Sequence, residues 1–144
     1  MATFTKVNDF VEALAEKVHN LGSDTLVVAL SNTAPNAETN DPTADGNGVL
    51  ANVTQIAYTN LSARSITTSA SAQTSGTYKL TLTDLVLTAS GGAVADFRYV
   101  YIYNDTATND ELIAVFDYGS TVSLADGDTF TIDFDAANGV LTIA

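Results

Sequence analysis

The chain has 144 residues, of which 46% are hydrophobic and 15% are charged. This balance excludes an intrinsically disordered chain, which is poor in apolar residues and rich in charge, and the length predicts a single domain spanning residues 1–144. Seventeen acidic and five basic residues give a net charge of −12, which argues against direct nucleic acid binding because so few dispersed bases form no basic patch.

The sequence also argues against disulfide cross-links and membrane insertion. It contains no cysteine, so neither a disulfide framework nor a thiolate metal site can form. The N-terminal stretch "MATFTKVNDF" lacks the basic region and long apolar run of a secretory signal. No stretch approaches the roughly 20 apolar residues of a spanning helix, so we expect a soluble chain with no membrane partner.

The spacing of apolar residues predicts one amphipathic helix at about residues 7–21. Apolar side chains recur there at intervals of three and four, at Val7, Phe10, Val11, Leu14, Val18 and Leu21. Gly22 is the expected left-handed residue that ends the helix.

After this helix the pattern changes to strands and loops. The continuous apolar run "TLVVALSN" (25–32) predicts a strand covered on both faces. Residues 33–48 hold both prolines and three acids, and predict a long acidic surface loop. The stretch 49–58 is ambiguous between a short helix and irregular chain.

The rest of the chain reads as short strands separated by turn signals. We expect strands at 63–72, at 77–88 with a bulge at "DLVL", at 94–103, and in "ELIAVFDYG", "STVSLADGD", "TFTIDFD" and "VLTIA". In "TFTIDFD", Phe130, Ile132 and Phe134 are predicted to point inward, and Thr131, Asp133 and Asp135 outward. This spacing predicts a mainly-β fold, an antiparallel β-sandwich of jelly-roll or immunoglobulin-like type with one N-terminal helix.

An aromatic ladder lies in the middle of this region. Phe97, Tyr99, Tyr101 and Tyr103 are predicted to share one face of a strand, with Val100 and Ile102 on the other. Such a ladder either fills a core, under the helix or against the opposite sheet, or forms a protein interface or a carbohydrate platform. The candidate contact surface consists of Tyr58, Phe97, Tyr99, Tyr101, Tyr103 and Tyr118.

No catalytic residue is predicted. His19 is the only histidine, and no nucleophile motif accompanies it. A histidine near a helix C-terminus more often interacts with the last carbonyls of the helix. The paired acids Asp110 with Glu111, Asp126 with Asp128 and Asp133 with Asp135 are predicted to be solvated, because a glycosidase needs two carboxyl groups facing each other across a cleft.

No cofactor or metal is predicted either. The loop "NDPTADGNG" has the composition of a calcium loop, but the twelfth position counted from Asn40 or Asp41 is Ala51 or Asn52 instead of the closing glutamate. A looser site built from Asp41, Asp45 and backbone carbonyls stays open as an alternative.

Three blocks of the chain resemble a family of small structural proteins of tailed bacteriophages. They are "FVEALAEKVHNLGSDTLVVALSNTAPNA", "SAQTSGTYKLTLTDLVLTASGG" and "FRYVYIYNDTATNDELIAVFDYGSTVSLADGDTFTIDFDAANGVLTI". The likeness covers nearly the whole chain and is weakest in loop 33–48. The family carries no catalytic motif, so the resemblance implies a non-enzymatic virion component.

The resemblance further implies a capsid decoration (cement) protein that binds the outside of the phage head. Its partner would be the major capsid protein, and it would be made in the host cytoplasm and end on the capsid surface of the virion. Capsid symmetry favours a homo-oligomer, most often a trimer. The alternatives are a tail or head fibre module that recognises a host surface glycan, and a phage-borne hydrolase.

Overall fold

The computed structural model describes residues 4–44 and 47–144. It is mainly β, as predicted, and all its strand pairs are antiparallel. The helical elements are α1 (Phe10–Ala15) and the 3-10 turn η1 (Leu50–Asn52). The strands are β1 (Phe4–Lys6), β2 (Leu26–Ser31), β3 (Ser65–Ile66), β4 (Thr68–Thr74), β5 (Thr77–Leu82), β6 (Leu85–Thr88), β7 (Val94–Asn104), β8 (Leu112–Leu124), β9 (Thr129–Ile132) and β10 (Leu141–Ile143).

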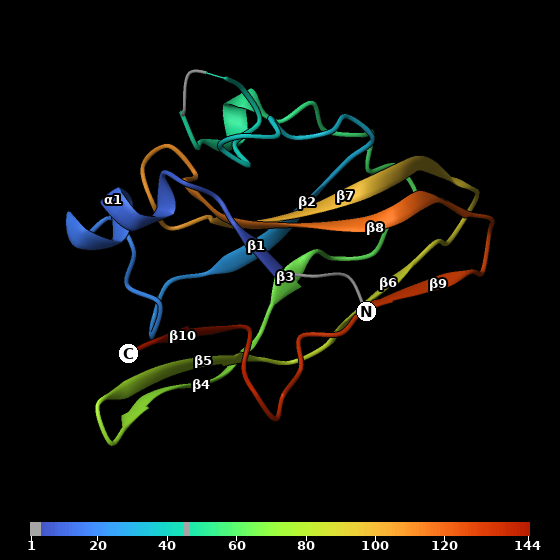
Figure 1. Ribbon diagram of the computed structural model, residues 1–144. Coiled ribbons are helices and arrows are strands. Elements are labelled where there is room, and N and C mark those ends of the chain that lie inside the picture. The colour runs from blue at the N-terminus through green and yellow to red at the C-terminus, as the bar shows by residue number, and fades with distance from the viewer. Residues whose placement is uncertain (1–3, 45–46) are drawn as a thin grey trace.

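A five-stranded sheet in the order β1-β8-β7-β2-β3 forms the centre of the molecule. The sheets β10-β5-β4 and β6-β9 lie on one side of it, and the loop that carries η1 lies on the other (Figure 1). Strand β2 is buried at every position, which confirms the strand predicted from its continuous apolar run. Each face of the central sheet therefore has its own cover.

The two faces carry two separate apolar clusters. On the face toward the small sheets, β7 contributes Phe97, Val100 and Ile102 to the larger cluster. On the opposite face, Tyr99, Tyr101 and Tyr103 pack with apolar residues that include Leu50 and Val53 of the loop region. The tyrosines are thus covered by a loop, and not by the helix or by a second sheet as the core alternative had it.

Phe97 packs in the other cluster from the tyrosines, at a place where the pairing of β7 with β8 is irregular. Phe97 pairs with Val122 and Tyr99 pairs with Asp117, so two steps along β7 correspond to five along β8. The extra residues of β8 loop outward, and the alternation of β7 changes phase at this point. The prediction that all four aromatic residues share one face is wrong for Phe97.

The helix is shorter than the predicted span 7–21. It ends because Lys17 adopts a left-handed conformation with φ of 66°. The Val18 N–H donates to the Ala13 carbonyl (2.8 Å) and the Lys17 N–H to the Leu14 carbonyl (3.3 Å), which is the Schellman pattern of a helix end. The predicted stop at Gly22 is therefore wrong, and Val11, expected on the buried stripe, is 53% exposed.

Replacing Lys17 with glycine is expected to raise the free energy of unfolding by about 0.5–1 kcal/mol, because glycine adopts positive φ without the clash of a Cβ atom. Thermal or urea denaturation measures the gain. Lys17→Ala removes the same charge but keeps the strain, and should change stability by less than about 0.5 kcal/mol. Equal effects of the two substitutions would show that the conformation at Lys17 carries no cost.

Several predicted strands have different limits in the structure. The predicted strand 77–88 is two strands, β5 and β6, which belong to different sheets, so the expected bulge at "DLVL" is a change of sheet. "ELIAVFDYG" and "STVSLADGD" form one bent strand, β8. Strand β9 ends at Ile132, although Ile132 and Phe134 are buried as predicted. The ambiguous stretch 49–58 is irregular apart from η1.

Candidate functional site

The structure buries most of the predicted contact surface. Phe97 is 0% exposed, Tyr101 1%, Tyr103 4% and Tyr99 8%. Side chains with so little accessible area have almost nothing to offer a partner. In this fold the aromatic ladder fills cores, one on each face of the central sheet.

Tyr58 is also committed to the fold. Its hydroxyl oxygen accepts a hydrogen bond from the Leu30 N–H (3.1 Å), and its O–H donates to Gln55 Oε1 (2.7 Å). The Arg64 guanidinium lies 3.7 Å from the ring centroid and donates to the Val28 carbonyl. Burial raises the pKa of Tyr58. This half-buried tyrosine anchors the segment after η1 to strand β2.

Tyr118 is the exposed member of the predicted set, at 52%. It lies in the β8 bulge, which we define as residues 117–121, all of them exposed. The bulge turns at Gly119, whose φ of 92° favours glycine, and the Gly119 N–H donates to Asp117 Oδ1 (2.8 Å).

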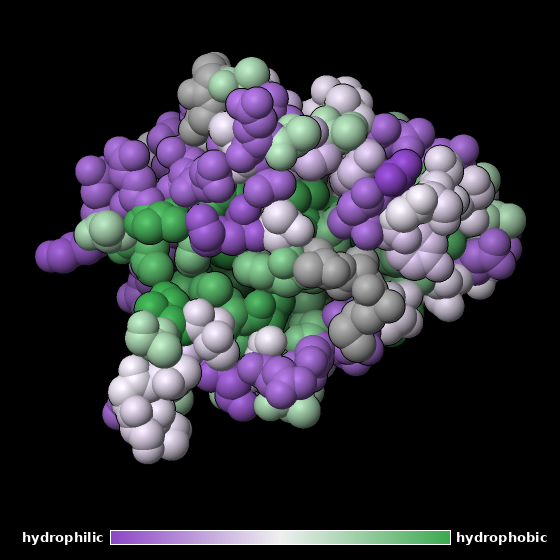
Figure 2. Space-filling view, viewed as in Figure 1, coloured by the Kyte–Doolittle hydropathy of each residue, from purple (hydrophilic) through white to green (hydrophobic). Residues whose placement is uncertain are grey.

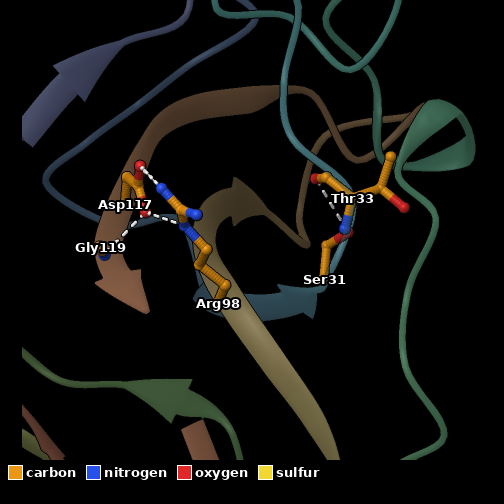
Figure 3. Close-up of polar contacts among 5 residues, drawn as sticks. All are labelled: Ser31, Thr33, Arg98, Asp117 and Gly119. Atoms are coloured by element: carbon orange, nitrogen blue, oxygen red, sulfur yellow. Dashed lines mark hydrogen bonds and ion pairs between the residues drawn. The ribbon is translucent and has the colours of Figure 1, made fainter. Parts of the chain in front are cut away.

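An ion pair fixes the start of the bulge (Figure 3). Arg98 on β7 donates from Nε to Asp117 Oδ1 (2.7 Å) and from Nη2 to Asp117 Oδ2 (2.8 Å). These hydrogen bonds hold the pKa of the Asp117 carboxyl below its usual range. The planar fork of arginine matches both carboxylate oxygens, so the pair sets the direction in which the bulge leaves the sheet. At the end of β2 a neutral hydrogen bond closes the chain, where the Thr33 N–H donates to Ser31 Oγ (3.0 Å).

Beside the bulge lies a hollow of about 350 Å³ between β8 and β9. We call it the aromatic slot, and its lining consists of Val100, Phe116, Tyr118, Phe130, Thr131, Ile132 and Asp133. The rings of Tyr118 and Phe130 are nearly perpendicular, at 78°, with centroids 5.3 Å apart. Of the residues that line the slot, the sequence analysis predicted only Tyr118 as a contact residue, because no local pattern indicates that β9 lies beside the bulge.

His19 is a buried structural residue, 6% exposed. Its Nδ1 lies 3.1 Å from Asn104 Nδ2, which also donates to Asp24 Oδ2 (2.6 Å), and its ring packs on Phe10 with centroids 5.3 Å apart. Burial lowers the pKa of His19, against the opposing charges of Glu111 and Asp24. The histidine therefore contacts Asn104, and not the last helix carbonyls that the sequence analysis favoured.

His19 also lines an open hollow of about 540 Å³ with Leu14, Leu21, Ser71, Tyr78 and Ile143 among its walls. In Figure 2 an apolar area is visible between α1 and β1 on one side and β10 on the other. Within the described residues the Nε2 atom of His19 has no hydrogen-bond partner, and the Ser71 hydroxyl lies 2.9 Å from the Tyr78 hydroxyl instead. His19 and Ser71 thus share a hollow without forming the hydrogen-bonded pair that nucleophilic catalysis requires.

The paired acids stabilise turns. Asp133 Oδ1 accepts from the Asp135 N–H (2.9 Å), and the Asp135 carboxylate accepts from the Asn138 side chain (2.8 Å), which lowers the pKa of Asp135. Asp126 and Asp128 likewise accept hydrogen bonds from backbone N–H groups. Asp133 and Asp135 follow β9 in a turn, so the prediction that they share the outer face of a strand is wrong.

Asp41 in the acidic loop is the most unusual carboxylate. It is 0% exposed, and neither oxygen has a hydrogen-bond partner among the described residues. Burial raises its pKa and the nearby Asp9 charge raises it further, whereas the Thr39 hydroxyl and the Asp9 amide, which lie near the carboxyl without completing a hydrogen bond, and the Lys6 charge oppose the rise. Asp45, the other member of the looser calcium site, lies outside the described residues.

Neither a metal cluster nor a membrane helix is present in the part of the chain that the structure describes. No three acidic or histidine side chains there come together as ligands. No helix of residues 4–44 or 47–144 is long and apolar enough to cross a membrane. Comparisons with family models, curated proteins and solved structures find no match to the chain.

Proposed function

We propose that this protein is a non-enzymatic structural protein of a bacteriophage virion, a capsid decoration protein on the outside of the head. The observation that carries the proposal is the resemblance of the blocks 10–37, 71–92 and 97–143 to small phage structural proteins. The last block builds β7, β8 and β9, and therefore the middle of the central sheet and the aromatic slot.

The use of polar residues fits a structural role. His19 packs in the interior, and the acids of two turn regions accept backbone or side-chain hydrogen bonds. The aromatic ladder fills cores on both faces of one sheet. A cement protein needs such a rigid scaffold together with a contact surface, and Tyr118 is the exposed tyrosine that remains for contact.

For the finer architecture we propose a single-domain antiparallel sandwich of jelly-roll or immunoglobulin-like type. For the assembly we propose a homotrimer that binds the major capsid protein at the virion surface. Each copy carries a charge of −12, so the buried apolar area has to outweigh mutual repulsion. The acidic turns then belong on rims, where salt screens them within about 10 Å.

Light scattering at moderate salt is expected to give the mass of a trimer, since closed symmetry is the rule for soluble homo-oligomers. In purified virions, quantitative mass spectrometry is expected to give a copy number comparable to that of the major capsid protein. Purified protein should also bind heads that lack it. A monomer that fails to bind such heads, or a copy number in the range of tail proteins, would refute the decoration role.

A fibre module that recognises a host surface glycan is the second candidate. The observation that favours it is the aromatic slot, a hollow with apolar walls and the polar groups of Tyr118, Thr131 and Asp133 at its lining. A low copy number per virion, together with retention of a host glycan by the purified protein, would favour this candidate.

A further inference from the structure

We propose that the aromatic slot binds an organic cation, an alkylammonium or guanidinium group. The inference rests on the shape and charge of the slot, and it holds whether the protein lies on a phage head or elsewhere. Ring orientation, charge and enclosure each support this class of ligand.

Three aromatic rings line the slot. Tyr118 and Phe130 stand at 78° with centroids 5.3 Å apart, and Phe116 adds a third aromatic wall. A cation is attracted to the negative face of an aromatic ring when it lies within about 6 Å of the ring centroid. In this T-shaped pair the edge of one ring meets the face of the other, so the ring that presents its edge keeps its own faces uncovered by its partner, and a cation over such a face is the contact that holds quaternary ammonium groups.

The charge of the slot points the same way. Asp133 is the one charged side chain among the described residues that line it, and the whole chain carries −12. Arg98 of β7 donates two hydrogen bonds to Asp117, so its charge is paired at the bulge. An anionic ligand would meet no basic group in the described lining, whereas a cation meets a carboxylate.

The enclosure fits a group of limited size. A volume of about 350 Å³ lies at the lower end of the range for small-ligand pockets. Val100 and Ile132 form apolar walls, and such surroundings strengthen a cation–π contact by excluding water. The ring of Phe130 is held in place from behind by Phe97, with centroids 5.3 Å apart at 85°, so this wall exists before a ligand arrives.

Two sources can supply such a group, a small free ammonium compound or a lysine or arginine side chain of a partner protein. Titrations followed by NMR distinguish them with choline and N-acetylarginine amide as probes. Their neutral isosteres are 3,3-dimethylbutan-1-ol and N-acetylcitrulline amide. We expect each preferred cation to bind about tenfold more tightly than its isostere. Preference for choline indicates a free ligand, and preference for the arginine probe indicates a partner side chain.

Substitutions of slot residues test whether the cation binds in the slot. Tyr118→Ala and Asp133→Asn are expected to weaken cation binding about fivefold or more, while Tyr118→Phe keeps the ring and most of the affinity. Val11→Ala, at an exposed apolar residue of α1 outside the slot, is the control and should have no effect. Since Tyr118 and Asp133 are exposed, these variants should fold. Equal binding of a cation and its isostere, binding of neutral sugars alone, or unchanged affinity in Tyr118→Ala would overturn the proposal.

Discussion

Replacing Tyr101 with alanine is expected to lower the free energy of unfolding by about 3–5 kcal/mol, the cost of removing a large side chain from a packed core. Tyr101 is 1% exposed in the middle of β7, opposite Ala29 of β2 and Val115 of β8. Chemical denaturation followed by circular dichroism measures the loss. Tyr118→Ala is the matched control, because the same atoms are removed from a side chain that is 52% exposed, and should cost no more than about 1.5 kcal/mol, the worth of its edge-to-face contact with Phe130.

The losses of stability at Tyr101 and Tyr118 together test whether the tyrosine face is a core or an interface. If Tyr101→Ala does not fold, Tyr101→Leu keeps an apolar side chain and should lose about 1–3 kcal/mol. Similar small losses at Tyr101 and Tyr118 would show that the loop does not cover the tyrosine face in solution. The ladder would then be available to a partner, as the interface alternative requires.

Strand alternation predicted the aromatic ladder well within β7 and failed at its beginning. Tyr99, Tyr101 and Tyr103 lie in one cluster, as a period of two requires. Phe97 belongs to the other cluster, and the register between β7 and β8 shifts on both sides of it. A bulge in a partner strand leaves no signal in the sequence of β7, so periodicity alone cannot reveal it.

The helix shows a different limit of periodicity. The apolar spacing continues to Leu21, which is buried, but the chain leaves the helix at Lys17. Partial burial of Val18 and full burial of Leu21 along a non-helical path give the same spacing as a longer helix. The residue that ends the helix is a lysine in a left-handed conformation, and no propensity rule favours lysine there.

The sequence predicted one residue of the candidate site and did not indicate the others. Tyr118 stands out in the sequence, but its neighbours Phe130 of β9 and Asp133, which follows β9, lie beside the bulge only through long-range packing. The sequence also did not indicate which residues pack over the tyrosines of β7. Leu50 and Val53 lie in a stretch with no clear period, and their contact with the central sheet is set by the path of the preceding loop.

Asp41 supplies the last prediction, since a fully buried carboxylate without a hydrogen bond destabilises the fold when it is charged. Asp41→Asn is expected to raise the free energy of unfolding at pH 7 by about 1–2 kcal/mol, because the charge is removed and the shape is kept. The exposed carboxylate of Asp105 provides the control, and Asp105→Asn should change stability by less than about 0.5 kcal/mol.

The direction of the pH dependence follows from the raised pKa of Asp41. Protonation in the folded state is favoured, so its stabilising contribution is complete below the unfolded value of 3.8 and is lost as pH rises through the higher folded pKa. The advantage of Asp41→Asn over the natural chain should therefore be small near pH 4 and grow toward pH 7. Urea denaturation at a series of pH values measures this difference.

A bound cation would reverse the expected effect of Asp41→Asn on stability, so the same variants test the calcium alternative. If Asp41 were a ligand, adding EDTA would destabilise the natural chain, and Asp41→Asn would be less stable than the natural chain at pH 7 in millimolar calcium. We expect neither result, because Asp41 has only Asp9 as a close acidic neighbour among the described residues, and calcium takes six to eight oxygen ligands. An unchanged melting temperature in EDTA, with the gain in Asp41→Asn retained, would identify Asp41 as a buried acid that holds no cation.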